Sequence, residues 1–325
     1  MSTIVLALIA LAGCRDSIGP GDSGFEIDIL ETATETPAKV LVTFRVSTED
    51  GEPVPNIPVD AFELLDNGVS DSDFESSKAF QPKPGLFQTS VGLLLDMSGS
   101  ITQSDALESL KSAADAFVDK ALEADGVAVG VWWFDGGTDI VRLTDFSDDD
   151  AAIKDSIAAL TEDVTRDEST NLNGAIRQGI EVVEDRMREG AATGVSQAGA
   201  LVVFTDGTDQ ANRVPASAAL AAVDSSTIAM FSIGLRGEID ETFLSRIGRS
   251  GSAFADNSDA LLSQFSGIGG RIEALANSFY VLAYCSPRRA GANNQLTIRL
   301  RLDGKQADAS TTYPAVNFGG GCTIE

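Results

Sequence analysis

The chain has 325 residues, of which 43% are hydrophobic, so it is long enough for one large or two moderate domains and can bury a core. It carries 49 Asp and Glu against 23 Lys and Arg, a formal net charge of −26. This charge argues against nucleic acid as a partner, because binding to phosphates needs concentrated Lys and Arg. The absence of histidine excludes Ser-His-Asp and Cys-His catalysis and histidine-based zinc sites.

The first fourteen residues, MSTIVLALIALAGC, combine a short apolar run with small residues before Cys14. The run Ile4–Ala12 is too short to span a bilayer and has the length of a signal-peptide apolar region. Leu11 to Cys14 resemble a bacterial lipobox, although no Lys or Arg precedes the apolar run. The resemblance implies cleavage before Cys14 and a lipid anchor on its thiol. The alternatives are an ordinary secretory signal or a buried strand.

Residues 15–24 are rich in Gly, Ser, Pro and Asp and predict a flexible tether after Cys14. Arg15, and not an Asp, follows the cysteine, and this favours sorting of the protein to the outer membrane. We therefore expect a lipid-anchored protein of the cell envelope, either periplasmic or exposed at the surface. The remaining cysteines, Cys285 and Cys322, form an even pair outside the cytoplasm, which favours a disulfide over two free thiols.

Residues 25–88 have the pattern of short strands and turns, which predicts a β-rich N-terminal domain. Lys39–Ser47 alternates in polarity and is rich in Val, Thr and Phe, as in a half-buried strand. A turn with Gly and Pro follows at Glu49–Pro53. Asp66-Asn67-Gly68 predicts a hairpin turn.

From about Thr89 the pattern changes to alternating strands and helices. Val91–Leu95 is a continuous apolar run, typical of a strand buried on both faces of a parallel sheet. Ser104–Glu123 places its apolar residues on one helical stripe. This alternation predicts a doubly wound, mostly parallel α/β domain over residues 89–277, with helices on both faces. The other expected elements are strands at Val127–Phe134, Ala200–Thr205 and Thr227–Ile233, and helices at Ala151–Leu160, Leu172–Arg188, Pro215–Val223, Glu241–Ile247 and Leu261–Ala276.

Residues 278–325 return to β character, with clear alternation at Phe279–Tyr284 and Gln295–Leu302. These strands either pair with the N-terminal domain or extend the central sheet, and the pattern alone does not decide between the two.

The strand Val91–Leu95 ends in Asp96-Met97-Ser98-Gly99-Ser100, directly before a helix. Ligands of open α/β sheets bind beyond the carboxyl ends of the strands. Alternate spacing in a tight loop brings the carboxylate of Asp96 and the hydroxyls of Ser98 and Ser100 towards one centre. These oxygen ligands suit a small hard cation such as Mg²⁺.

The same residues resemble the opening Asp-x-Ser-x-Ser element of the metal-ion-dependent adhesion site in von Willebrand factor type A (vWA) domains. Two further elements of that site follow in order. Thr170, in the loop before a helix, matches the expected Thr, and Asp206, at the end of a buried strand, matches the expected Asp. The resemblance covers residues 89–277. Residues 43–68 also resemble the small β-sandwich that precedes the vWA domain in some bacterial proteins.

The resemblance implies a binding protein and not an enzyme. Ser98 and Ser100 would coordinate Mg²⁺ (or Mn²⁺ or Ca²⁺), with Asp96, Asp206 and Thr170 holding it directly or through water. An Asp or Glu carboxylate of a protein partner would complete the coordination. Two alternatives remain: a structural envelope lipoprotein whose metal site only stabilises the fold, and a metal-dependent hydrolase, which would need a general base other than His.

Other prominent side chains near these motifs have simpler roles. Asp105, Asp135 and Asp139 are expected to be solvated or capping residues, and Asp209 is expected either to do the same or to support the ligands. Trp132 and Trp133 lie in an expected core strand and have no predicted binding role.

Overall fold

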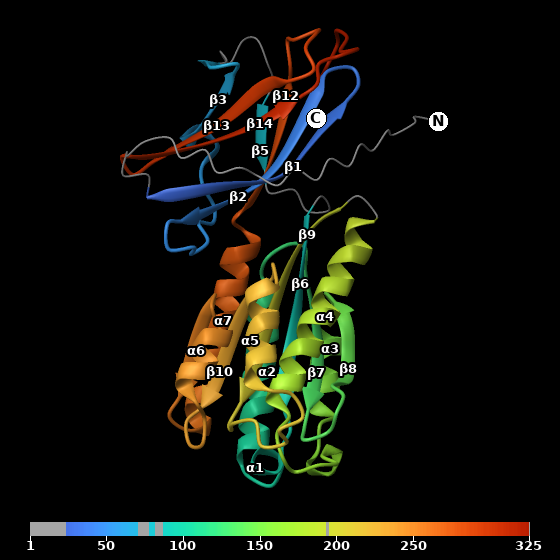
Figure 1. The fold of residues 1–325 in the computed structure, drawn as a ribbon, viewed down its shortest axis with the longest axis vertical. Coiled ribbons are helices and arrows are strands. Elements are labelled where there is room, and N and C mark those ends of the chain that lie inside the picture. The colour runs from blue at the N-terminus through green and yellow to red at the C-terminus, as the bar shows by residue number, and fades with distance from the viewer. Residues whose placement is uncertain (1–23, 71–77, 82–86, 193–194, 325) are drawn as a thin grey trace.

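The computed structural model of the protein describes residues 24–70, 78–81, 87–192 and 195–324. These residues form an α/β unit with a β-sandwich at one end of it (Figure 1). Cys14 lies outside the described residues, and so does the expected tether except for Gly24. Within the described part of the chain, no helix has the length and apolar character needed to cross a membrane.

The α/β unit is built on a six-stranded sheet with the order β11-β10-β9-β6-β7-β8. All neighbouring strands are parallel except β7 and β8, which are antiparallel. The central strands are buried along nearly their whole length, because helices cover both faces. The strands are β6 (Phe87–Asp96), β7 (Val127–Phe134), β8 (Val141–Ser147), β9 (Ser196–Thr205), β10 (Ala229–Leu235) and β11 (Gly251–Ala255).

Three helices pack on each face of this sheet. One face contacts α2 (Ala106–Ala121), α3 (Asp150–Ala158) and α7 (Leu261–Ala276), and the other contacts α4 (Leu172–Ala191), α5 (Ala216–Ser225) and α6 (Glu241–Ile247). Trp133 and Trp132 point into these two cores from opposite faces of β7, and both are buried. The short helix α1 (Gly99–Thr102) follows β6 directly, and 3₁₀ turns occur at Val59–Ala61, Glu162–Val164 and Ser258–Ala260.

The β-sandwich is assembled from both ends of the chain. One sheet has the order β1-β2-β12-β5 and the other the order β14-β13-β3-β4. The strands are β1 (Phe25–Glu35), β2 (Lys39–Thr48), β3 (Phe62–Asp66), β4 (Val69–Ser70), β5 (Lys78–Gln81), β12 (Phe279–Cys285), β13 (Asn294–Leu302) and β14 (Lys305–Tyr313). Pairing of β12 with β2 and of β13 with β3 joins the C-terminal strands to the N-terminal strands and not to the central sheet.

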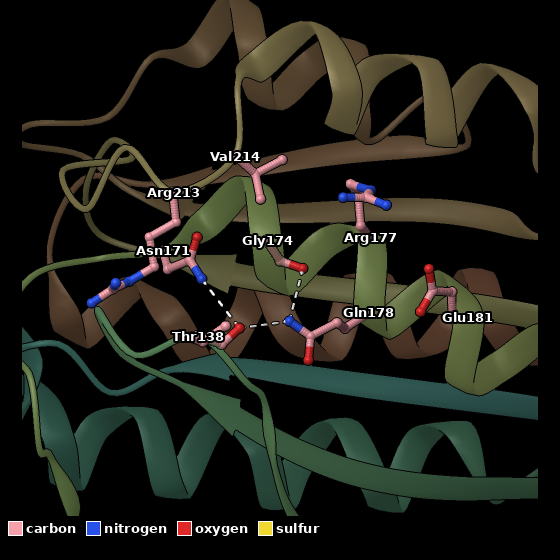
Figure 2. Close-up of a pocket in the computed structure, with 8 residues that line it drawn as sticks. All are labelled: Thr138, Asn171, Gly174, Arg177, Gln178, Glu181, Arg213 and Val214. Atoms are coloured by element: carbon pink, nitrogen blue, oxygen red, sulfur yellow. Dashed lines mark hydrogen bonds between the residues drawn. The ribbon is translucent and has the colours of Figure 1, made fainter.

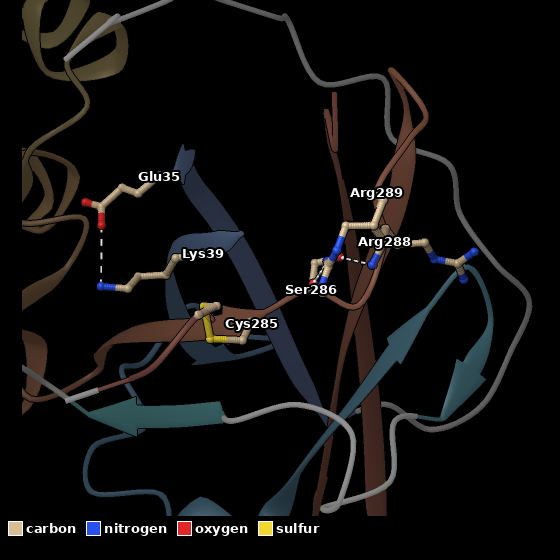
Figure 3. Close-up of a disulfide and its surroundings, with 7 residues drawn as sticks. Glu35, Lys39, Cys285, Ser286, Arg288 and Arg289 are labelled. Carbon is tan, nitrogen blue, oxygen red and sulfur yellow. Dashed lines mark hydrogen bonds and ion pairs between the residues drawn. A yellow bond between two sulfur atoms is a disulfide. The ribbon is translucent and has the colours of Figure 1, made fainter. Parts of the chain in front are cut away.

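Two local features of the sandwich follow from its sequence. Asn67 and Gly68 have φ angles of 50° and 79° and link β3 to β4, as an Asn-Gly hairpin turn requires. Cys285, at the end of β12, forms a disulfide with Cys322 across a Cα–Cα distance of 5.7 Å. Figure 3 shows this bond beside Lys39, the residue of β2 that pairs with Cys285. The disulfide attaches the C-terminal tail to the sheet.

Candidate metal site

Asp96 ends β6 and organises the loop that follows it. The side chain is fully buried. Its Oδ1 accepts a 2.9 Å hydrogen bond from the backbone N–H of Ser98. The Ser98 and Ser100 hydroxyl oxygens lie 3.3 Å apart, because α1 begins between them and turns both toward the same side. The loop thus places one carboxylate and two hydroxyls together at the carboxyl end of the sheet.

Asp206 comes from the neighbouring strand. It directly follows β9, which pairs in parallel with β6, so the two strands end at the same edge of the sheet. The hydroxyls of Ser100 and Ser98 interact with the Asp206 carboxylate and act to lower its pKa. Thr205, the residue before Asp206, donates a 2.6 Å hydrogen bond to Oδ2 of Asp96. The two acidic residues therefore approach each other across the strand ends.

Thr170 reaches this group from the loop before α4. Its side chain is buried, and its Oγ1 lies 3.8 Å from the position that a Cβ on Gly207 would occupy. The carbonyl of Thr170 accepts hydrogen bonds from the backbone N–H groups of Gln210 and Ala211, at 2.9 and 3.1 Å. A further backbone bond, from Gly99 to the carbonyl of Glu168, ties the same loop to α1. The structure thus groups Asp96, Ser98, Ser100 and Asp206 and places Thr170 beside Gly207, the residue that follows Asp206.

The two carboxylates carry an electrostatic cost. Burial, reinforced by the charge of Asp206, raises the pKa of Asp96 to about 7, although hydrogen bonds from Thr205 and Ser98 oppose the rise. Burial also raises the pKa of Asp206, and the charge of Glu238 adds to this effect. Oδ1 of Asp206 is buried and has no hydrogen-bond partner. An isolated buried charge of this kind is unfavourable unless a cation or a donor meets it.

These residues fit a divalent cation. Two carboxylates and three hydroxyls supply oxygen ligands, and the unpartnered carboxylate oxygen of Asp206 supplies negative charge for an ion. Within the described residues, no group of three or more His, Cys, Asp or Glu side chains is arranged to hold a metal. The predicted site is of another kind, because only two of its five ligands are acidic and the others are Ser or Thr.

Among the neighbouring acidic residues, Asp105 and Asp139 are exposed, as expected, whereas Asp135 and Asp209 accept hydrogen bonds from backbone N–H groups. Asp135 is buried rather than solvated, and its carboxylate accepts hydrogen bonds from three backbone N–H groups of the surrounding loops. Asp209 accepts bonds from the N–H groups of Asn173 and Asn212 and so fixes the loop after Asp206.

Sequence reasoning missed two residues that act on the carboxylates, Thr205 and Glu238. Thr is common in strands because β-branched residues favour them, so nothing in the sequence marks the hydroxyl of Thr205 as a hydrogen-bond donor to Asp96. Glu238 lies on the separate loop after β10, and no motif connects it with Asp206.

Residues 90–267 match the family model of the von Willebrand factor type A domain. No curated protein matches the chain.

Several solved structures are similar to this chain at low identity. A von Willebrand factor type A protein from Catenulispora acidiphila is 12% identical with a TM-score of 0.47, and the match covers 90% of this chain and 72% of that one. Proximal thread matrix protein 1 from the mussel byssus, with a zinc-occupied MIDAS motif, is 16% identical with a TM-score of 0.46, covering 58% and 48%. The vWF domain of the type V pili tip protein Mfa5 from Porphyromonas gingivalis is 16% identical with a TM-score of 0.44, covering 57% and 95%.

The family match spans more than half of the chain and includes every residue of the candidate metal site. This protein therefore belongs to the von Willebrand factor type A domain family.

Proposed function

We propose that this protein binds a partner protein through a divalent metal ion held by Asp96, Ser98, Ser100, Thr170 and Asp206. The observation that carries the proposal is the buried, unpartnered Oδ1 of Asp206, which lies beside a second buried carboxylate and two hydroxyls. A bound cation would balance both carboxylates. A carboxylate of the partner, from Asp or Glu, would then complete its coordination.

Mg²⁺ suits this set best, because it prefers oxygen ligands in octahedral geometry and retains bound waters, and Mn²⁺ or Ca²⁺ could occupy the same ligands. The ion would act as an electrostatic link between protein and partner. We propose no reaction at this site: both carboxylates are assigned to the ion, and the sequence has no histidine to serve as a base.

Metal dependence is tested by thermal unfolding with added Mg²⁺ and with EDTA. At a concentration 100-fold above its dissociation constant, Mg²⁺ should add about 2.7 kcal/mol to the free energy of unfolding. Asp206→Asn should lose most of this gain, whereas Asp139→Asn, which changes an exposed acid of the loop between β7 and β8, should keep it. Equal gains in the two variants would contradict the proposed ligand set.

Partner binding is tested with a minimal ligand, aspartate capped at both ends. With Mg²⁺ present, it should shift the NMR signals of the Ser98, Ser100 and Thr170 amides, and capped asparagine should not. EDTA should abolish the shifts. Metal-dependent stabilisation with no response to the aspartate ligand would favour the alternative in which the ion only supports the fold.

The envelope location forms a separate part of the proposal. The lipobox-like sequence ending at Cys14 supports cleavage and lipid attachment at that residue, and Arg15 supports sorting to the outer membrane. Cys14→Ser should move the protein from the membrane fraction to the soluble fraction and stop incorporation of labelled fatty acid. Unchanged fractionation would rule out the lipid anchor while leaving the metal site untouched.

A further inference from the structure

A pocket of about 250 Å³ (Figure 2) is lined by Asn171, the residue that follows the proposed ligand Thr170 in the chain. Three segments enclose it: the loop between β7 and β8, the first turns of α4, and the end of the loop between β9 and α5. None of its residues is among the proposed metal ligands. The lining residues are Thr138, Asn171, Gly174, Arg177, Gln178, Glu181, Arg213 and Val214.

One loop connects the metal site to this pocket. It starts at Asp206, a proposed ligand, and ends at Val214, which lines the pocket. Within it, Gln210 donates its backbone N–H to the carbonyl of Thr170. The side-chain Nδ2 of Asn173 donates a 3.0 Å bond to the carbonyl of Val214. Hydrogen bonds thus fix the middle and the end of the loop to the start of α4, and the pocket keeps a defined position relative to Thr170.

One wall of the pocket has an unsatisfied acceptor. Asn171 follows Thr170 in the chain, and its side chain is 3% exposed. Its Nδ2 donates a 2.7 Å bond to the carbonyl of Gly137, but its Oδ1 is buried and has no hydrogen-bond partner. An unsatisfied buried acceptor costs roughly 1–3 kcal/mol. A ligand that supplied an N–H here would remove that cost.

The second turn of α4, on the same side of the pocket, has an available donor. Figure 2 shows Asn171 and Arg177 on either side of Gly174. Arg177 is exposed, and among the described residues its guanidinium has no hydrogen bond or ion pair. The other arginine of the pocket, Arg213, is already engaged, because its guanidinium donates to the carbonyl of Gly136 and to Asp167. Asn171 and Arg177 thus leave an acceptor and a donor without protein partners at this pocket.

An uncharged amide matches this pair of groups. Its N–H₂ would donate to Oδ1 of Asn171, and its carbonyl would accept from Arg177. A carboxylate has no N–H to donate and would leave Oδ1 of Asn171 unsatisfied. An ammonium group has no oxygen to accept a hydrogen bond from Arg177. The aliphatic side chain of Val214 adds an apolar surface for the methylene groups of a Gln or Asn.

We infer that this pocket is a second subsite of the partner-binding surface and takes the amide side chain of an Asn or Gln. This residue belongs to the same partner segment as the carboxylate that completes the metal coordination. The inference rests on the proposed function. It adds a sequence requirement to the partner, namely an amide residue close to the acidic one.

The test uses capped peptides in which Gln follows Asp after none, one or two Gly residues, and matched peptides with Ala or Glu in place of Gln. They are titrated into the isotope-labelled full chain with Mg²⁺ and followed by NMR. For one spacing, Gln should bind about tenfold more tightly than Ala, as expected for two net hydrogen bonds. That peptide should also shift the signals of the Asn171 side chain and the Gly174 amide.

Arg177→Gln should remove the preference for Gln without changing Mg²⁺ binding. The control is Arg246→Gln, which changes an exposed arginine of α6 and should preserve the preference. Equal binding of the Gln and Ala peptides, tighter binding of the Glu peptide, or an unchanged preference in Arg177→Gln would overturn the subsite while leaving metal-dependent aspartate binding in place. No Mg²⁺-dependent shift with any Asp peptide would overturn both the subsite and the proposed function.

Discussion

Asp96 and Asp206 illustrate how a parallel sheet gathers residues that are far apart in sequence. Each follows an apolar strand, and the two strands are neighbours, so both carboxylates leave the sheet at one edge. Burial at that edge raises the pKa of both. The cost of burying charge, which a metal ion would relieve, is therefore a property of the fold as well as of the two residues.

The raised pKa of Asp96 makes a prediction about stability in metal-free buffer. Its pKa of about 7 exceeds the usual value of 3.8. Between these two pH values the folded state holds a proton that the unfolded state releases. The contribution of this protonated carboxyl to the free energy of unfolding is thus fully present below pH 4. It is lost as the pH rises to 7, which lowers the free energy of unfolding by roughly 4 kcal/mol. Relative to the wild type, Asp96→Asn should gain stability over this range. Urea unfolding at several pH values measures the difference, and parallel profiles would contradict the raised pKa.

The positions of three proposed ligands at the ends of strands or before a helix were predictable from the sequence. Asp96 and Asp206 end apolar runs, and Thr170 precedes a clear helical pattern, so the topology of a parallel sheet places them at one edge. The hydroxyl of Thr205 and the amide of Asn171 were not predictable. Their roles depend on distances between separate loops, which no periodicity in the sequence encodes.

At the scale of elements, the contact between α2 and α7 depends on a missing side chain. A Cβ on Gly269 would lie 2.8 Å from Cβ of Lys120 and 3.2 Å from the carbonyl oxygen of Phe117, both in α2. Gly267, two residues earlier in α7, has nothing within 4 Å of the same position. Of these two glycines, only Gly269 is therefore required for close packing of the helices.

We expect Gly269→Ala to lower the free energy of unfolding by about 1–3 kcal/mol, because the helices must separate. Gly267→Ala should raise it by up to about 1 kcal/mol, because Ala favours a helix over Gly without meeting a neighbour. Chemical denaturation of the two variants measures both effects. Equal effects of the same sign would show that α2 and α7 do not pack as described.

The C-terminal tail depends on a covalent element. The Cys285–Cys322 disulfide spans 37 residues and includes β13 and β14 in its loop. In the chain-entropy model, closing such a loop contributes about 4 kcal/mol. Replacing both cysteines with Ser should remove this amount from the stability of the sandwich. A reducing agent should destabilise the wild type and leave the double variant unchanged. If it destabilises both equally, the effect does not arise from this bond.

The elements that sequence predicted are those buried on both faces or on a single stripe. β6, β7 and β9 are apolar runs, and α2 and α7 show clear helical stripes. The edge strands β8 and β11 were missed. They are half exposed, and their sequences VRLTDFS and GSAFA mix polar and small residues as loops do. Only pairing with a neighbouring strand defines such segments.

At the scale of the whole molecule, the sandwich and the metal site occupy opposite ends. Figure 1 shows α1, which contains Ser100, at the end farthest from β12 and the rest of the sandwich. The connection between the two units is short: α7 ends at Ala276 and β12 begins at Phe279. The ring of Phe279 stacks on Phe87, the first residue of β6, at a centroid distance of 4.0 Å. Both strands thus start from one aromatic contact.

This arrangement predicts that Mg²⁺ binding and reduction of the disulfide affect opposite ends of the molecule, which hydrogen exchange can measure. Mg²⁺ should slow exchange at the amides of residues 96–102, 168–171 and 205–211, where the ion would join three loops. Reduction of the disulfide should speed exchange in β12, β13 and β14 and in the strands β2 and β3 that pair with them. Each change should leave the other end unaltered, because the two hydrophobic cores share no residues. Protection by Mg²⁺ that extends through α7 into β12 would contradict this independence and would identify the stacked Phe87 and Phe279 as the route between the units.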